Sequence, residues 1–74
     1  MYRTVVSVEG MMCAMCEKHV NEAVKNVMKV KKVTSDHKAD RTEILSKEAP
    51  DEALIRDAIC EEGYTVSGFS VEEV

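Results

Sequence analysis

The sequence predicts an α+β fold in which two helices cover one face of a four-stranded antiparallel sheet. Four short stretches are rich in β-branched residues, as strands are, and two longer stretches repeat apolar residues at helical spacing. Their order along the chain is β-α-β-β-α-β, which is the order of the ferredoxin-like sandwich. A chain of 74 residues buries one modest core, so we expect residues 1–74 to form a single domain.

A short loop separates the first strand from the first helix. Residues Tyr2–Glu9 are rich in valine and partly alternate, which favours a strand. The helix is expected to begin between Ala14 and Cys16 and to end at Val27 or Met28. Its apolar residues form one stripe, as in helices that pack on a core. This stripe comprises Val20, Ala23, Val24, Val27 and Met28.

A hairpin is expected after the first helix. Residues Val30–Ser35 and Arg41–Ser46 are predicted as its two strands, because both contain β-branched and apolar residues and are bounded by polar ones. The polar, turn-like residues Asp36–Asp40 join them.

The second helix and the last strand complete the pattern. Residues Pro50–Glu52 are predicted to open the helix, since proline suits a first turn and acids complement the helix dipole. Ala49 before them is a poor N-cap, so we expect this start to fray. Gly63 ends the helix, and Tyr64–Val71 is the last strand, interrupted by Gly68. The predicted core positions of this helix are Leu54, Ile55, Ala58 and Ile59.

Composition and charge argue against nucleic-acid binding and predict two oppositely charged faces. The net charge of −4 argues against a nucleic-acid binder, and three aromatic residues are too few for a base-stacking surface. Residues 1–46 contain eight Lys or Arg and six Asp or Glu, whereas residues 47–74 contain two and eight. We therefore expect one mildly basic face and one acidic face, both usable in protein docking.

Several absences bear on location and activity. No apolar run is long enough for membrane insertion. We expect no secretory signal, since Met1–Arg3 lead directly into the first strand. An odd number of cysteines, three, fits a reduced protein, so we expect a cytoplasmic location. The chain also lacks a catalytic-triad motif and a Gly-rich phosphate loop.

Cys13 and Cys16 lie where the loop enters the first helical turn. Free N–H groups and the positive end of the helix dipole stabilise a thiolate there, so these thiols are expected to ionise more readily than a free cysteine. A Cys-x-x-Cys at such a place serves soft-metal binding or dithiol redox chemistry. Right-handed crossovers put three loops at one end of the fold, forming a rim that a partner can reach. The residues expected along this rim are Cys13, Cys16, His37, Gly63 and Tyr64.

Two motifs resemble those of a known family. The segment Gly10-Met11-Met12-Cys13-Ala14-Met15-Cys16 is similar to the Gly-Met-x-Cys-x-x-Cys signature of the heavy-metal-associated domain family. The segment Ala58-Ile59-Cys60-Glu61-Glu62-Gly63-Tyr64 resembles the ending of that family's second helix. The resemblance extends from about Thr4 to Phe69. Members of the family include copper chaperones and the N-terminal modules of metal-transporting P-type ATPases, and they share the βαββαβ fold.

The resemblance implies roles for individual residues. Cys13 and Cys16 would be the metal ligands, and Met11 would turn inward to support the loop without binding metal. Gly63 and Tyr64 would form the loop that faces the site. Tyr64 would shield the metal or donate a hydrogen bond beside it, with packing of its ring on the core as an equal alternative.

The expected cargo is a soft metal ion. Two thiolates without a third obvious ligand suit a soft cation of low coordination number, so Cu(I) leads, ahead of Zn(II), Cd(II) and Hg(II). Together with the resemblance, this predicts a Cu(I) chaperone that passes its ion by thiolate ligand exchange. The acceptor would be a metal-transporting P-type ATPase or another thiolate protein. Such a carrier is no enzyme, and we expect a monomer without metal and a metal-bridged dimer as a further state.

Two alternatives stay open. A glutaredoxin-like thiol-disulfide oxidoreductase also places Cys-x-x-Cys at a helix start, but its fold needs a proline just before a strand, and Pro50 precedes a helix. An excised metal-binding module of a P-type ATPase would carry the same motifs as a free chaperone. The starting Met1 and an end soon after the last strand favour the stand-alone protein.

Further sulfur-containing residues depart from the family's pattern. Met12 stands where the family often has threonine, and Met15 lies between the two cysteines. Flexible packing is the favoured role for both, with thioether contacts to Cu(I) as the alternative. Cys60 is expected to be a bystander thiol, with a role as third thiol at the site as the alternative.

Three polar residues are expected to have no part in metal binding. His19 follows Cys16 by one turn, and helix geometry directs it to solvent. His37 is interpreted as a loop histidine. Ser35 and His37 stand where related domains place apolar strand residues, which we expect to weaken this edge of the hairpin.

Overall fold

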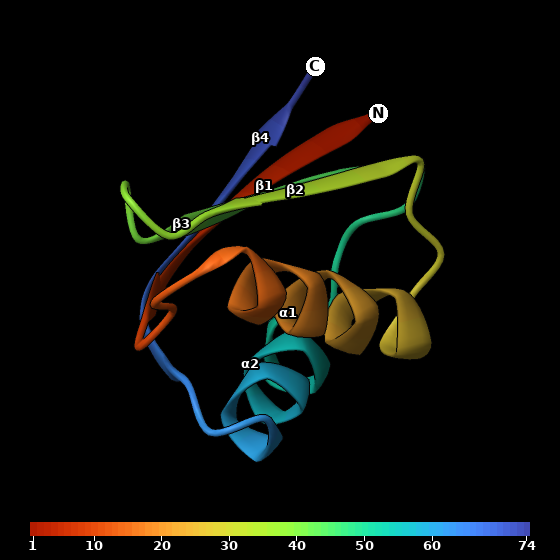
Figure 1. The fold of residues 1–74 in the computed structure, drawn as a ribbon. Coiled ribbons are helices and arrows are strands. Elements are labelled where there is room, and N and C mark those ends of the chain that lie inside the picture. The colour runs from red at the N-terminus through yellow and green to blue at the C-terminus, as the bar shows by residue number, and fades with distance from the viewer.

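Two helices and four strands alternate along the chain in the predicted β-α-β-β-α-β order. The computed structural model describes all 74 residues. Both helices lie on one face of the sheet, and the other face is uncovered (Figure 1). The elements are β1 (Tyr2–Glu9), α1 (Ala14–Val27), β2 (Lys32–Asp36), β3 (Arg41–Ser46), α2 (Glu52–Glu61) and β4 (Thr65–Glu73).

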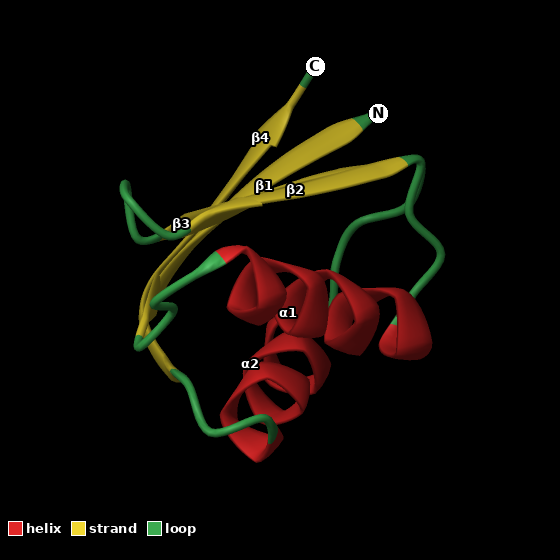
Figure 2. Ribbon diagram, viewed as in Figure 1, coloured by secondary structure: helices red, strands yellow, loops and turns green.

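The strand order is β2-β3-β1-β4, and every neighbouring pair is antiparallel, as the ferredoxin-like prediction requires. The strands β2 and β4 are therefore the edges of the sheet. The loops after β1, β2 and α2 all lie at the end away from the two termini, which confirms the predicted rim (Figure 2). Neither helix is long and apolar enough to cross a membrane.

The core lies between the sheet and the two helices. Residues of β1 alternate in burial, as expected for a strand with one covered face, and the stripe of α1 packs against that face. Met11 joins the same cluster from the loop between β1 and α1. The fully buried aliphatic side chains are Val6, Val8, Val20, Val24, Ile44, Ile55 and Ile59.

The hairpin differs from the prediction at its first strand. β2 begins at Lys32 instead of Val30, because the chain needs residues 28–31 to return from the end of α1 to the sheet. Val30 still packs against the core, but it does so from this connection.

Ser35 is buried at the hairpin edge with its hydrogen bonds made, so it is not the unsatisfied polar residue on which the expected weakening rested. Its side chain is buried, and its hydroxyl donates to Oδ1 of Asn21 on α1 at 2.6 Å. Because that proton is committed, Ser35 accepts from the hydroxyl of Thr42 on β3 at 2.9 Å. The hydroxyl thus links α1, β2 and β3, and its two hydrogen bonds offset the cost of removing it from water.

The start of α2 also differs from the prediction. The helix begins at Glu52, and Asp51 is its N-cap, whose side chain accepts from the Leu54 N–H at 3.3 Å. The prediction of a frayed start behind Ala49 is therefore wrong. Leu54 is 49% exposed and is not a core residue, since Ile55 and Ile59, four positions apart, take the face toward the sheet.

The expected interruption of the last strand is a β-bulge. Ser7 pairs with Gly68 and Val8 with Val66, so Ser67 is an extra residue on β4. Side chains three apart on a regular strand point to opposite faces, but the bulge lets Val66 and Phe69 both pack against the core. β4 continues to Glu73, two residues beyond the predicted end, because it stays paired with β1 throughout.

Candidate metal centre

Cys13 and Cys16 bring two thiols together at the start of α1. Cys13 is the N-cap, with an extended backbone (φ −162°, ψ 176°) and an exposed side chain, and Cys16 is half-buried in the first turn. The two Sγ atoms are 3.8 Å apart. No side chain caps the N-terminus of this helix, so free N–H groups remain at the end of α1 where the two thiols lie.

The environment of Cys16 favours the thiolate. A backbone hydrogen bond from Met12 is the main cause that lowers the pKa of Cys16 to about 7, and the Tyr64 hydroxyl adds to it, against some desolvation. The same contact raises the pKa of Tyr64 to about 12, since its proton is shared with the sulfur. Part of the Cys16 thiol is therefore ionised at neutral pH. The loop and Tyr64 thus add to the helix dipole on which the sequence-based expectation rested.

Tyr64 is placed over the loop by two glycines. Gly63 has φ +95°, a left-handed conformation that ends α2, and the Tyr64 N–H donates back to the carbonyl of Ile59 at 3.4 Å. At Gly10, where φ is +104°, a Cβ atom would lie 3.4 Å from Cδ1 of the tyrosine ring. The half-buried ring of Tyr64 packs against the core, as one of its two expected roles requires. Its hydroxyl acts on the pKa of the neighbouring Cys16 thiol, and its role beside a bound metal stays a prediction.

The three methionines of the motif differ in burial. Met11 is 4% exposed and anchors the loop in the core, as the resemblance implied. Met12 and Met15 are 83% and 58% exposed, so the expectation that they serve packing is wrong. Of the three methionines, only Met11 is buried, and the thioethers of Met12 and Met15 lie at the surface.

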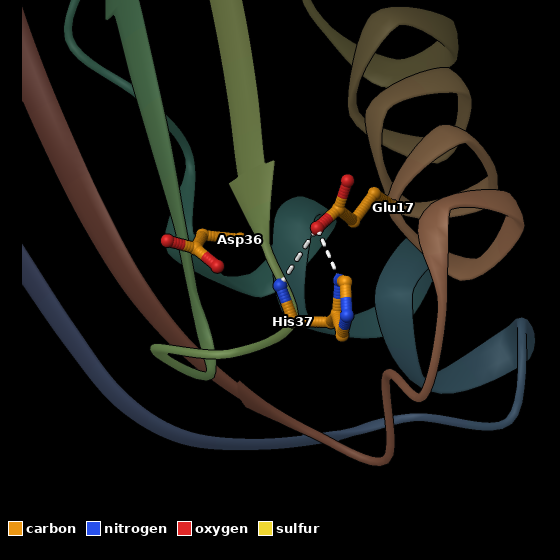
Figure 3. Close-up of side chains that lie close together, drawn as sticks. All are labelled: Glu17, Asp36 and His37. Atoms are coloured by element: carbon orange, nitrogen blue, oxygen red, sulfur yellow. Dashed lines mark hydrogen bonds and ion pairs between the residues drawn. The ribbon is translucent and has the colours of Figure 1, made fainter.

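Glu17 and His37 form a pair that sequence reasoning missed. One oxygen of Glu17, Oε2, accepts from the His37 backbone N–H at 2.9 Å and contacts Nδ1 of the ring at 2.6 Å (Figure 3). Because a carboxylate only accepts, the second contact requires a proton on Nδ1. The His37 backbone N–H, followed by the ring, holds the pKa of Glu17 below its usual value. The sequence did contain a signal for this pair. Glu17 lies in the first turn of the predicted helix, and His37 lies in a loop predicted at the same rim.

Asp36 lies near this pair, and one ligand-type atom from each residue lies within 4.8 Å of the others. However, its carboxylate points away from Glu17 in Figure 3. It accepts from the N–H groups of Lys38 and Ala39, at 2.9 and 3.3 Å, which closes the hairpin turn. All three groups thus already serve structural hydrogen bonds.

The remaining candidate residues lie outside the thiol pair. His19 is exposed on α1, as expected. Cys60 is an exposed, free thiol in the last turn of α2, and its carbonyl accepts from the Gly63 N–H at 3.0 Å. Its backbone thus begins the turn that leads to Tyr64.

Comparison with known proteins gives a consistent result. A family model described as the heavy-metal-associated domain matches residues 5–65. The solved structure of the CopZ metallochaperone is 25% identical with a TM-score of 0.78, over 86% of this chain and 97% of that chain. A copper binding domain from HMA7, a P-type ATPase, is 25% identical with a TM-score of 0.75, over 99% of this chain and 96% of that chain. The N-terminal domain of ZntA in its Zn(II) form is 25% identical with a TM-score of 0.78, over 88% of each chain. No curated protein matches the chain.

Proposed function

The chain belongs to the heavy-metal-associated domain family, and we propose that it is a soft-metal carrier that holds Cu(I) between Cys13 and Cys16. The observation that carries the proposal is the 3.8 Å separation of the two Sγ atoms. With metal–sulfur bonds of about 2.3 Å, two thiolates on one ion lie about 3.8 Å apart at a tetrahedral angle and about 4.6 Å apart when linear. The observed spacing equals the tetrahedral value and would have to widen by about 0.8 Å for linear coordination, so it supports binding of an ion between the two thiols without selecting which ion.

The ligand set favours Cu(I) over Zn(II), Cd(II) and Hg(II). Two thiolates satisfy a soft monovalent ion of low coordination number, whereas zinc sites in proteins have three or four protein ligands. Glu17 and His37, which offer further donor atoms at the same rim, are engaged with each other. Met11 is buried and supports the loop, so it supplies no third ligand. The similar proteins include both a metallochaperone and a Zn(II)-bound domain, so the ion is the first point to test.

Release of the ion would proceed by ligand exchange. Cys13 is exposed, whereas Cys16 is half-buried beneath Tyr64, so an incoming thiolate replaces Cys13 first and Cys16 second. At each step one metal–sulfur bond forms as another breaks, and no oxidant or reductant is needed. The acceptor is a thiolate pair, as in the N-terminal domain of a metal-transporting P-type ATPase or in a second copy of this chain. The role requires a compartment that keeps both thiols reduced, such as the cytoplasm.

The test is an anaerobic titration of the reduced protein with Cu(I) against a chromogenic chelator. The proposal expects the chain to take Cu(I) from the chelator and Cys13→Ser/Cys16→Ser to lose this ability. The same competition with Zn(II) should give much weaker binding. Failure of the parent protein to compete for Cu(I) overturns the copper assignment, and stronger competition for Zn(II) moves the proposal to zinc.

A further inference from the structure

A groove lies at the C-terminal end of α1, at the opposite end of the helix from Cys13 and Cys16. It has a volume of about 600 Å³ and is lined by the last turn of α1, the connection to β2 and the start of β2. Its apolar lining comes from the half-buried Met28, Val30 and Val33. A second depression of about 170 Å³ shares part of this lining. The charged residues around the two depressions are one acid, Glu48, and five exposed lysines, namely Lys25, Lys29, Lys31, Lys32 and Lys47.

These lysines carry unpaired charge. The three ion pairs of the molecule involve arginine or histidine, and none involves a lysine. Half of the ten Lys and Arg residues thus gather at one end of a chain whose net charge is −4. The helix dipole favours a lysine such as Lys25 near the end of α1, and a lysine such as Lys32 protects an edge strand from unwanted pairing. Neither effect accounts for five unpaired lysines around an apolar lining.

The groove adjoins a free backbone edge. Because β2 is an edge strand, one side of it presents N–H and C=O groups that no other strand pairs with. Lys32 and Val33, at the start of β2, also line the groove. An extended peptide can add to such an edge through backbone hydrogen bonds, while its alternate side chains reach the neighbouring surface.

We propose that the free edge of β2 and the lysine groove together bind an extended acidic segment of another protein, in which carboxylate and apolar side chains alternate. Strand addition supplies affinity that does not depend on side chains. The carboxylates lie among the lysines and orient the segment, and the apolar side chains cover Met28, Val30 and Val33.

Three features favour a peptide over other polyanions. A phosphate or a lipid headgroup would leave the apolar lining in water, and a flat membrane surface fits a concave groove poorly. The groove holds no arginine, the residue whose planar fork recognises phosphate through two parallel hydrogen bonds. It also holds no aromatic side chain on which a nucleic-acid base could stack.

The groove is independent of the proposed metal centre. The 14 residues of α1 separate the two, and at about 1.5 Å per residue they span roughly 21 Å. Figure 1 shows the loop before α1 and the connection after it at opposite ends of the helix. An acidic partner can therefore hold the chain while the cysteine loop exchanges its ion, and substitution of the cysteines should leave peptide binding unchanged.

The test uses the full, isotope-labelled chain and a capped peptide of alternating Glu and Val, followed by two-dimensional NMR. Addition of the peptide should shift amide signals of residues 25–34 and of Lys47 and leave those of the cysteine loop in place. The same peptide with Gln for Glu should bind at least about fivefold more weakly, because the charge pairs are lost. A peptide N-methylated at alternate residues keeps its charges but lacks strand-pairing donors, and it should not bind.

Two double variants test whether the peptide responds to the lysines of the groove or only to the net charge of the protein. Lys31→Gln/Lys32→Gln should weaken binding of the Glu-Val peptide by roughly three- to tenfold. Lys18→Gln/Lys38→Gln removes the same charge from exposed positions at the cysteine end and should change affinity by less than about twofold, since salt screens distant charges. The spectrum of each variant without peptide reports whether it is folded.

Each contrary result overturns the proposal. Equal binding of the N-methylated peptide rules out strand addition, and equal loss in the two variants reduces the effect to net charge. Shifts at the cysteine loop in place of β2 assign the peptide to the other end of the molecule. In a separate experiment the peptide is replaced by vesicles of phosphatidylserine and phosphatidylcholine. If the protein binds these vesicles but not the peptide, the groove is a lipid-binding site. None of these results bears on the Cu(I) titration, so the two proposals fail independently.

Discussion

Oε2 of Glu17 lies 2.9 Å from the backbone nitrogen and 2.6 Å from the ring nitrogen Nδ1 of His37, a residue twenty positions away in the sequence. These two contacts fasten the first turn of α1 to the turn between β2 and β3. Cys16 directly precedes Glu17, so this link supports the backbone that holds the thiol pair.

Replacing Glu17 with Gln should lower the melting temperature at neutral pH. The fold holds the pKa of Glu17 below its usual value, so the ionised carboxylate stabilises the fold above that value, and this contribution disappears as pH falls through the lowered pKa. Parent and variant should therefore differ at neutral pH and converge in acid, as measured by circular dichroism. Glu22→Gln, at an exposed position on the same helix, is the control, and an equal loss there would mean that Glu17 acts only through helix charge.

The reactivity of Cys16 should depend on Tyr64. Alkylation of Cys16, followed by site-resolved mass spectrometry as pH is varied, should give a midpoint near the pKa of about 7. Tyr64→Phe removes the hydroxyl that donates to the thiolate, so the midpoint should move to higher pH. Tyr2→Phe removes a hydroxyl from the far end of β1 and should leave it in place. An unchanged midpoint in Tyr64→Phe would show that the loop backbone alone lowers the pKa of Cys16.

The three cysteines should contribute unequally to metal affinity. Cys13→Ser or Cys16→Ser should each weaken Cu(I) binding by more than about hundredfold, beyond the loss typical of an outer-shell partner. Cys60→Ser should leave most of the affinity, because this thiol is free and exposed on α2. Competition with a chelator measures all three variants. A loss at Cys60 as large as that at Cys13 would assign it a ligand role.

The cap of α2 should contribute measurably to stability. Asp51→Ala removes the acceptor for the Leu54 N–H, which should lower the free energy of unfolding by about 0.5–1 kcal/mol. Asp57→Ala, at an exposed position within the same helix, serves as the control in urea denaturation. If both variants lose the same amount, Asp51 stabilises the helix through its charge and not through its hydrogen bond.

The elements of the fold could be predicted because local pattern decides them. The β-branched stretch of β1 and the apolar stripe of α1 appear in the structure within the expected bounds. The predictions that failed concern side chains whose hydrogen-bond partners depend on the three-dimensional structure. The N-cap of α2 is Asp51 and not Ala49, because the helix begins at Glu52. Ser35 is buried with its hydrogen bonds made because Asn21 and Thr42 lie next to it.

In the candidate site too, contacts within one helical turn could be predicted from the sequence, and contacts between distant segments could not. Spacing in the chain is enough to predict that Cys13 and Cys16 lie side by side, since both belong to one helical turn. The contact of Glu17 with His37 depends on where the hairpin turn meets the helix, and no local pattern carries that information. The burial of Met11 and the exposure of Met12 and Met15 likewise follow from the path of the loop, although all three residues have the same chemistry.

The pairing of β1 with β4 brings the two ends of the chain together. Tyr2 pairs with Glu73, and the Val74 N–H donates to the carbonyl of Met1 at 2.8 Å, at the far end of β1 from the cysteine loop. The next row of paired residues runs from Glu72 through Arg3 and Leu45 to Lys32. A reporter or an affinity tag fused at either terminus will therefore leave the thiols accessible but emerge beside the start of β2. Labels for metal-transfer measurements can be placed at the termini, whereas measurements at the lysine groove call for a chain without such fusions.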